Sequence, residues 1–64
     1  MNNVERATMT RKEAANYLGI STWLLWRWTK EGLIPSFRIG SRVLYRKESL
    51  DSLMIELERK ARRA

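Results

Sequence analysis

The sequence predicts a small α+β domain that is mainly helical, and three local patterns support this prediction. Residues 11–30 contain two helical segments separated by a glycine. Residues 37–45 alternate around a Gly-Ser pair, and apolar residues recur at helical spacing from residue 50 onward. Together these patterns indicate two hinged helices, a β-hairpin and a third helix, in that order.

Length and composition narrow the functions open to this domain. Its 64 residues allow one compact domain, and a domain of this size buries only about 60% of the surface that the unfolded chain exposes. Cysteine and histidine are absent, so the chain has no disulfide, no thiolate ligand and no histidine general base. The 7 carboxylates are scattered, and each has a helix-surface or capping explanation. We therefore expect no enzyme, no metal site and no cofactor.

The charge of the chain indicates its partner. The net charge is +6, from 13 Lys and Arg against 7 Asp and Glu, which favours nucleic acid first and an anionic membrane surface second. No apolar run approaches the roughly 20 residues that span a bilayer, and the N-terminal residues lack the apolar core of a signal peptide. We expect double-stranded DNA as the partner, no membrane, and a cytoplasmic location.

The first two helices carry clear boundary signals. Thr10 and Glu13 fit a capping box that starts a helix over residues 11–18. Gly19 suits the turn, and Ser21 is a good N-cap for a second helix that ends near Glu31. Apolar residues at helical spacing form the inner faces, with Ala14, Ala15 and Leu18 on the first helix and Ile20, Leu25 and Trp28 on the second. This is the layout of a helix-turn-helix, whose second helix enters the major groove.

The outer face of the second helix carries the candidate DNA contacts Ser21, Thr22, Trp23, Trp26, Arg27 and Lys30. Arg27 can donate two parallel hydrogen bonds to guanine, while Lys30 suits a phosphate. The alternatives for Arg27 are a solvated face or an ion pair with Glu31. Trp23 and Trp26 can contact sugar-phosphate or thymine methyls, dock a neighbouring protein, or lie flat on the surface as part of a wider core.

A hairpin is predicted after the two helices, with strands at residues 37–39 and 43–45 and a turn at residues 40–41. Alternation is expected to turn four side chains toward the helices and two outward. The first group is Phe37, Ile39, Val43 and Tyr45, and the second is Arg38 and Leu44. Such a hairpin is a wing, so the predicted fold is a winged helix-turn-helix. Arg38 and Arg42 are candidates for a minor groove, with edge-strand charge as the alternative.

The third helix is predicted to begin near Glu48 or Ser49 and to close the core with one apolar stripe, formed by Leu50, Leu53, Met54, Leu57 and Ala61. The basic run at residues 59–63 fits a phosphate clamp, a solvated tail, or cations that stabilise a helix C-terminus. Four side chains are further possible phosphate contacts: Arg11, Arg46, Arg59 and Lys60. The expected organisation is a flexible N-terminus (1–9), a DNA-binding domain (10–58) and a basic end (59–64).

Three runs of sequence resemble a known family. They are TRKEAANYLGIS at residues 10–21, WRWTKEGLIP at 26–35 and FRIGSRVLYRKESL at 37–50. In this order and spacing they are similar to the excisionase-type DNA-binding domains, which are small winged helix-turn-helix proteins related to the MerR DNA-binding domain. The resemblance implies a recombination directionality factor of a phage or mobile element, acting in a bacterial host cell. Such a factor binds repeated DNA sites, bends the DNA and helps a tyrosine or serine integrase to excise the element.

The resemblance also implies roles for individual residues. It assigns recognition-helix roles to Thr22, Trp23, Trp26, Arg27 and Lys30, and wing roles to Arg38, Ser41 and Arg42. The sequence departs from the family pattern by its outward tryptophans and by Leu44, which stands where arginine is frequent. No stable dimer of the MerR type is expected, so neighbouring copies on DNA are the expected self-contacts. The alternatives are a small phage transcriptional regulator and a protein-interaction module that docks through exposed tryptophans.

Overall fold

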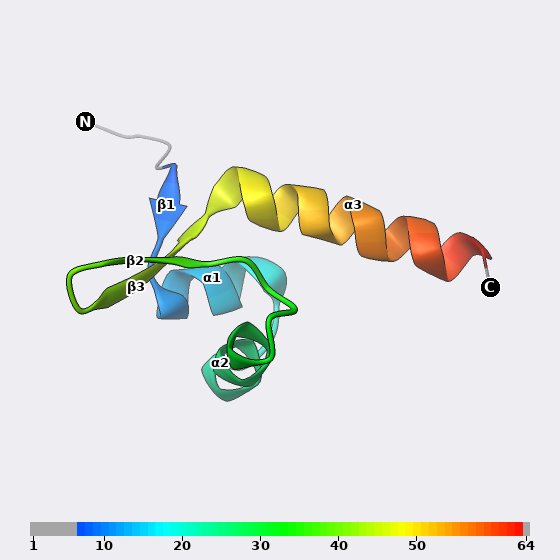
Figure 1. Cartoon of the computed structure of the whole chain (residues 1–64). Coiled ribbons are helices and arrows are strands. Elements are labelled where there is room, and N and C mark those ends of the chain that lie inside the picture. The colour runs from blue at the N-terminus through cyan, green and yellow to red at the C-terminus, as the bar shows by residue number, and fades with distance from the viewer. Residues whose placement is uncertain (1–6, 64) are drawn as a thin grey trace.

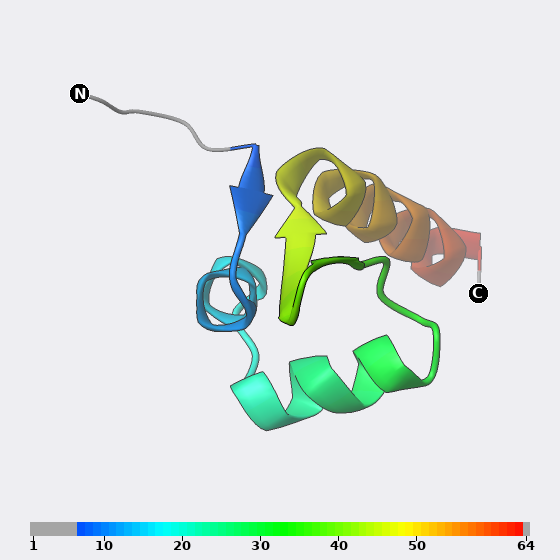
Figure 2. The ribbon, with the colours of Figure 1, turned by 60° about the vertical axis from the view of Figure 1, so that its left-hand side comes forward.

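The computed structural model describes residues 7–63, and it confirms the predicted fold class. In chain order its elements are β1 (Thr8–Met9), α1 (Arg11–Leu18), α2 (Thr22–Lys30), β2 (Phe37–Ile39), β3 (Arg42–Arg46) and α3 (Lys47–Arg63) (Figure 1). The strands form one antiparallel sheet in the order β1-β3-β2. β3 lies in the middle, with α1, α2 and α3 arranged around it (Figure 2). The hinged helices α1 and α2 and the β2–β3 wing make up a winged helix-turn-helix.

The boundaries of α1 and α2 are those that the capping signals predict. The Glu13 backbone N–H donates to the Thr10 hydroxyl at 3.3 Å, and the Glu13 carboxylate accepts from the Thr10 N–H at 3.0 Å. Gly19 follows α1 in the left-handed region at φ 78°, and the Ser21 hydroxyl accepts from the Leu24 N–H at 3.1 Å. These caps satisfy N–H groups that a helix start leaves unpaired. They fix where each helix begins and how α2 departs from α1.

The register of the wing corrects the predicted orientation of its side chains. Three pairs form between the strands: Phe37 with Leu44, Arg38 with Val43, and Ile39 with Arg42. Residues that pair directly across a ladder share a face, so Arg38 lies on the face of Val43 and Tyr45. The prediction that Phe37 and Ile39 share that face, with Arg38 turned away from it, is wrong. Because the turn has two residues, 40 and 41, each odd-numbered residue of β2 pairs with an even-numbered residue of β3. An odd-numbered side chain of β2 therefore lies on the face of the hairpin opposite the odd-numbered side chains of β3.

A short strand precedes α1, where the sequence predicted only a flexible segment. Thr8 pairs with Arg46 and Met9 with Tyr45, and the Lys47 N–H donates to the Ala7 carbonyl at 3.0 Å. Met9 also packs against the core. β1 therefore ties the chain before Thr10 to the sheet, which corrects the prediction for Thr8 and Met9. The rest of the predicted flexible segment, residues 1–6, lies outside the described residues.

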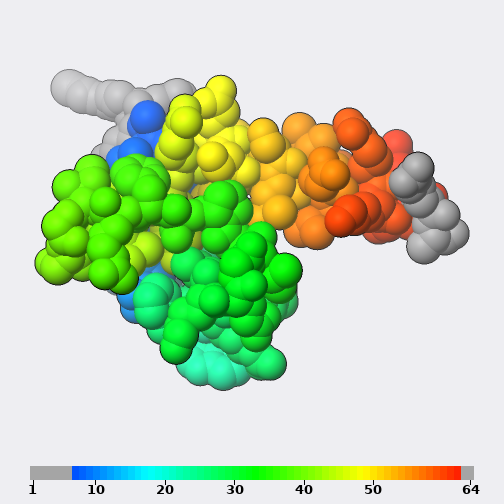
Figure 3. Space-filling model, viewed as in Figure 1, coloured from blue at the N-terminus to red at the C-terminus, as the bar shows by residue number. Residues whose placement is uncertain are grey.

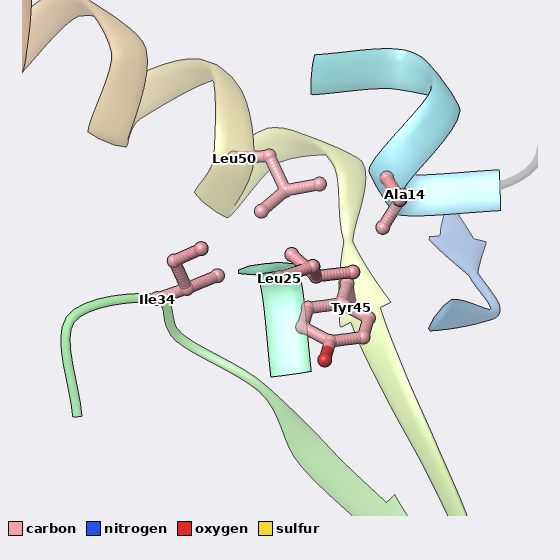
Figure 4. Close-up of a cluster of buried hydrophobic side chains, with 6 residues drawn as sticks. Ala14, Leu25, Ile34, Tyr45 and Leu50 are labelled. Carbon is pink, nitrogen blue, oxygen red and sulfur yellow. The ribbon is translucent and has the colours of Figure 1, made fainter. Parts of the chain in front are cut away.

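The core lies where the three helices meet β3. Its buried members are Ala14, Ala15, Leu25, Ile34, Tyr45 and Leu50, most of which Figure 4 labels. Leu18, Ile20 and Trp28 pack against this cluster while partly buried, so the predicted inner faces of α1 and α2 are confirmed. The Tyr45 hydroxyl lies 2.8 Å from the Thr29 hydroxyl, which itself donates to the Leu25 carbonyl at 2.7 Å. Thr29 has only one proton to give, so Tyr45 is the donor, and the buried phenol is satisfied.

Only the first part of α3 belongs to this core. Leu50 is buried and Leu53 partly buried, whereas Met54, Leu57 and Ala61 are exposed. The prediction that one stripe from Leu50 to Ala61 closes the core is therefore wrong beyond Leu53. The helix runs on past the body of the domain, and its C-terminal half stands clear of the other elements (Figures 1 and 3). None of the helices within residues 7–63 is long and apolar enough to cross a membrane.

Candidate nucleic-acid interface

The outer face of α2 is available to a ligand along its whole length. Leu25 is buried beneath the helix, with Leu24 and Trp28 partly buried beside it. These contacts fix which side of the helix faces the core. Three exposed candidate residues, Trp23, Arg27 and Lys30, lie on the opposite side, and two more, Ser21 and Thr22, are exposed at the N-terminal end of the helix. Trp23, Arg27 and Lys30 therefore form one exposed strip on α2, with Trp26 partly buried beside it.

The three tryptophans of α2 have different surroundings. Trp28 packs against the core, as predicted. Trp26 is partly buried, and the Arg11 guanidinium of α1 lies 4.2 Å from the centre of its ring, within the range of a cation–π contact. Trp23 is 66% exposed. Trp23 and Trp26 are therefore not equivalent, because Trp26 bridges α2 to α1 whereas Trp23 projects from the surface.

Arg27 is held by side chains one turn away on either side. Its Nε donates to the Glu31 carboxylate at 3.3 Å, and its guanidinium carbon lies 5.6 Å from the centre of the Trp23 ring. The ion pair between Arg27 and Glu31, which the sequence allows as an alternative role for Arg27, is thus present. An exposed pair of this kind contributes only about 0–1 kcal/mol to stability, so it leaves Arg27 able to bind a ligand. Trp23, Trp26, Arg27, Lys30 and Glu31 line one shallow depression.

The wing contributes Arg38 to the surface beside α2. Arg38 lines a groove with Phe37 and Val43 of the wing and with Trp26, Thr29 and Lys30 of α2. This placement follows from the register, which puts Arg38 on the face of Val43. Ser41 and Arg42 are exposed at the tip of the wing, and Arg42 pairs with Ile39 on the opposite face of the hairpin. The wing and α2 are visible together on one side of the molecule in Figure 3.

The four possible phosphate contacts lie in three separate places. Arg11 lies on the α2 surface through its contact with Trp26. Arg46, at the end of β3, forms an ion pair with Glu48 at 2.7 Å. Arg59 and Lys60 are exposed on the part of α3 that extends away from α2 (Figure 1). Only Arg11 is therefore brought together with the predicted recognition residues.

Two exposed residues were not among the predicted contacts, one on the α2 surface and one on the face of the wing opposite Arg38. Glu31, at the C-cap of α2, was recognised from the sequence only as a possible partner of Arg27. Ile39 is 62% exposed near the wing tip, and correct pairing across the two-residue turn would have revealed it. Among the described residues, no group of three or more carboxylates is placed to hold a metal ion. The surface is thus a cationic and aromatic strip with a single carboxylate beside Arg27.

Comparison with known proteins agrees with this geometry. A family model described as a helix-turn-helix domain matches residues 8–57. No curated protein and no solved structure matches the chain significantly. The matched range begins at β1 and ends within the exposed part of α3. It therefore contains both of the hinged helices, the complete wing, and the buried first turns of α3.

Proposed function

The chain belongs to the helix-turn-helix domain family, which binds DNA, and we propose that it is a sequence-specific accessory factor of recombination. In this proposal α2 lies in the major groove and the wing contacts the adjacent minor groove. The observation that carries the binding mode is the groove in which Arg38 of β2 meets Trp26 and Lys30 of α2. A duplex on this surface meets the recognition helix and the wing at once.

Each exposed cation has a distinct part in the proposed complex. Arg27 lies mid-helix on the exposed strip and donates to a guanine edge, and Thr22 lies near the helix N-terminus, where side chains come closest to the bases. Lys30 and Arg11 bind phosphates on either side of the helix, and Arg38 enters the groove beside the wing. Phosphate contacts position the protein, and base contacts specify the sequence.

The recombination role is supported by the resemblance to excisionases in the runs LGIS, KEGLIP and RIGSR. A single module buries only about 600–1,000 Å² on DNA, which is little for high specificity. Several copies on repeated sites, with contacts between neighbours, supply the remainder. DNA bent by these copies brings the distant sites of an integrase together, so a protein without catalysis biases the direction of recombination.

A recombination assay tests this role directly. Purified integrase and a supercoiled plasmid carrying the attachment region are incubated with and without the protein, and excised circles are counted. We expect excision to depend on the wild-type chain and to fall for Lys30→Ala, which removes a proposed phosphate contact. Excision that is unchanged by the protein, together with binding at a promoter, would make transcriptional regulation the better account.

Binding titrations test the binding mode itself. The logarithm of the association constant should fall with log salt by roughly 0.9 per phosphate contacted, and gel shifts on one, two and three tandem sites should show cooperative loading with bending. A flat salt dependence would favour the protein-interaction alternative. Independent occupancy of straight DNA would refute cooperative bending and leave simple operator binding.

A further inference from the structure

Trp23, Arg27 and Glu31 form a ladder along the outer face of α2, spaced one turn apart. Arg27 lies in the middle, with its Nε bonded to Glu31 at 3.3 Å and its guanidinium 5.6 Å from the centre of the Trp23 ring. The two terminal nitrogens, Nη1 and Nη2, make no hydrogen bond within the described residues. The donors that remain are therefore the N–H groups of Nη1 and Nη2 at the tip of the guanidinium.

Helix stability does not explain the position of Glu31. The residue caps the C-terminus of α2, where the helix dipole disfavours a negative charge. An ion pair with the arginine N-terminal to the glutamate is also the weaker of the two orientations on a helix. In addition, a carboxylate beside a DNA-binding surface repels phosphate. The Glu31 carboxylate is therefore unfavourable for the helix dipole, weak as an ion-pair partner and repulsive to phosphate, so we look for its role in its effect on Arg27.

We propose that Glu31 and Trp23 are positioning residues that fix Arg27 for end-on recognition of guanine, a role that rests on the proposed placement of α2 in the major groove. Guanine presents O6 and N7 as adjacent acceptors, and Nη1 and Nη2 match them with two parallel hydrogen bonds. Because Glu31 already accepts the hydrogen bond from Nε, Arg27 cannot bind guanine side-on, which would use Nε together with one Nη. Trp23 limits the rotation of the guanidinium, so less side-chain freedom is lost when the base is bound.

If Glu31 positions Arg27, Glu31→Gln should lower the preference for cognate over random duplex without lowering the affinity for random duplex. Losing the carboxylate reduces repulsion of phosphate, so binding to random duplex should stay equal or become tighter. The ratio of affinities for cognate over random duplex should fall about two- to fivefold, the range expected when an exposed ion pair is lost. The melting temperature should not fall, because the charge opposes the helix dipole. Trp23→Ala should lower the same ratio without unfolding the domain, because Trp23 is 66% exposed.

The test begins with selection of a cognate duplex from a randomised pool, and dissociation constants are then measured on it and on random duplex. Glu58→Gln is the matched control, since it removes the same charge from an exposed position on the projecting part of α3. It should leave the ratio unchanged. In an Arg27→Lys background, Glu31→Gln should no longer alter the ratio, because lysine lacks the fork that Glu31 orients.

The outcomes separate the two proposals. If the wild type selects a site, but Glu31→Gln and Glu58→Gln give the same ratio as the wild type, the positioning role is wrong and DNA recognition stands. If Glu31→Gln acts equally in the Arg27→Lys background, Glu31 acts through something other than Arg27 and the positioning role is again overturned. If the wild type selects no site from the pool, sequence-specific recognition fails, and the positioning role fails with it.

Discussion

Truncation of Leu50 and Leu57 to alanine separates the packed part of α3 from its projecting part. Leu50 is completely buried, whereas Leu57 is 55% exposed. A buried Leu→Ala change costs about 2–5 kcal/mol, because apolar contacts are lost and a cavity remains. At roughly 0.05–0.15 kcal/mol per residue, a chain of this size has about 3–10 kcal/mol of stability in total. Leu50→Ala should therefore remove a large share of it.

Leu57→Ala should change stability by no more than about 0.5 kcal/mol. The side chain is largely in water already, and leucine and alanine have similar helix propensities. The two variants remove the same atoms from the same helix, seven residues apart, so the comparison isolates burial. We expect the thermal midpoint to drop by about 10 °C or more for Leu50→Ala and to stay near the wild-type value for Leu57→Ala.

Urea unfolding followed by tryptophan fluorescence provides the assay, because Trp28 packs against the core and reports its loss. Each variant is measured at several protein concentrations. Equal destabilisation by Leu50→Ala and Leu57→Ala would refute the view that the C-terminal half of α3 stands clear of the core. If that loss also depended on protein concentration, a second copy would be covering the exposed face of α3.

Three further outcomes follow from individual contacts. Tyr45→Phe should cost about 0.5–1.5 kcal/mol in urea unfolding, because Thr29 keeps its bond to the α2 carbonyl; a loss above about 3 kcal/mol would mean that an orphaned group remains. The hydrogen bond to Asp51 raises the pKa of Tyr17, so the stability that this bond contributes is complete below about pH 10 and is lost as the pH rises through the raised pKa. Thermal melts of Tyr17→Phe at alkaline pH should lack this loss of stability. A Tyr17→Phe variant with the same alkaline stability profile as the wild type would contradict the role of the bond. Replacing one cognate thymine with uracil should weaken binding of the wild type but not of Trp23→Ala, if Trp23 packs on a thymine methyl; an equal effect on both proteins would remove that contact.

The helix-turn-helix could be predicted from the sequence because its signals are local. The capping box of Thr10 and Glu13, the glycine at 19 and the N-cap at Ser21 each act within a few residues, and each is found in the structure. Helical periodicity likewise identified Leu25 as a core residue. Such features depend on the geometry of one turn of chain, so they do not need the tertiary fold to be known.

Features that depend on distant partners could not be predicted in the same way. β1 has only two residues, too few for a period of two to be seen, and it exists because β3 offers it an edge. On α3, periodicity shows which side is apolar but not whether another element covers it, so Leu50 and Leu57 look alike in the sequence. The register of the wing does follow from its two-residue turn, because that turn pairs Ile39 with Arg42, whereas alternation along each strand does not show which residues pair across the hairpin.

The net charge of +6 is likewise visible in the sequence and favours DNA as the partner, but it does not show which cations lie together in the fold. The fold divides them. Arg11 and Arg38 come from α1 and β2, yet both meet side chains of α2, at Trp26 and at the groove beside Lys30. The cations of residues 59–62, by contrast, extend away from that surface on α3 (Figure 1). In the proposed complex the first group lies within reach of a single duplex and sets its position. The second group adds mainly to the long-range attraction that brings DNA to the protein, an effect that salt weakens.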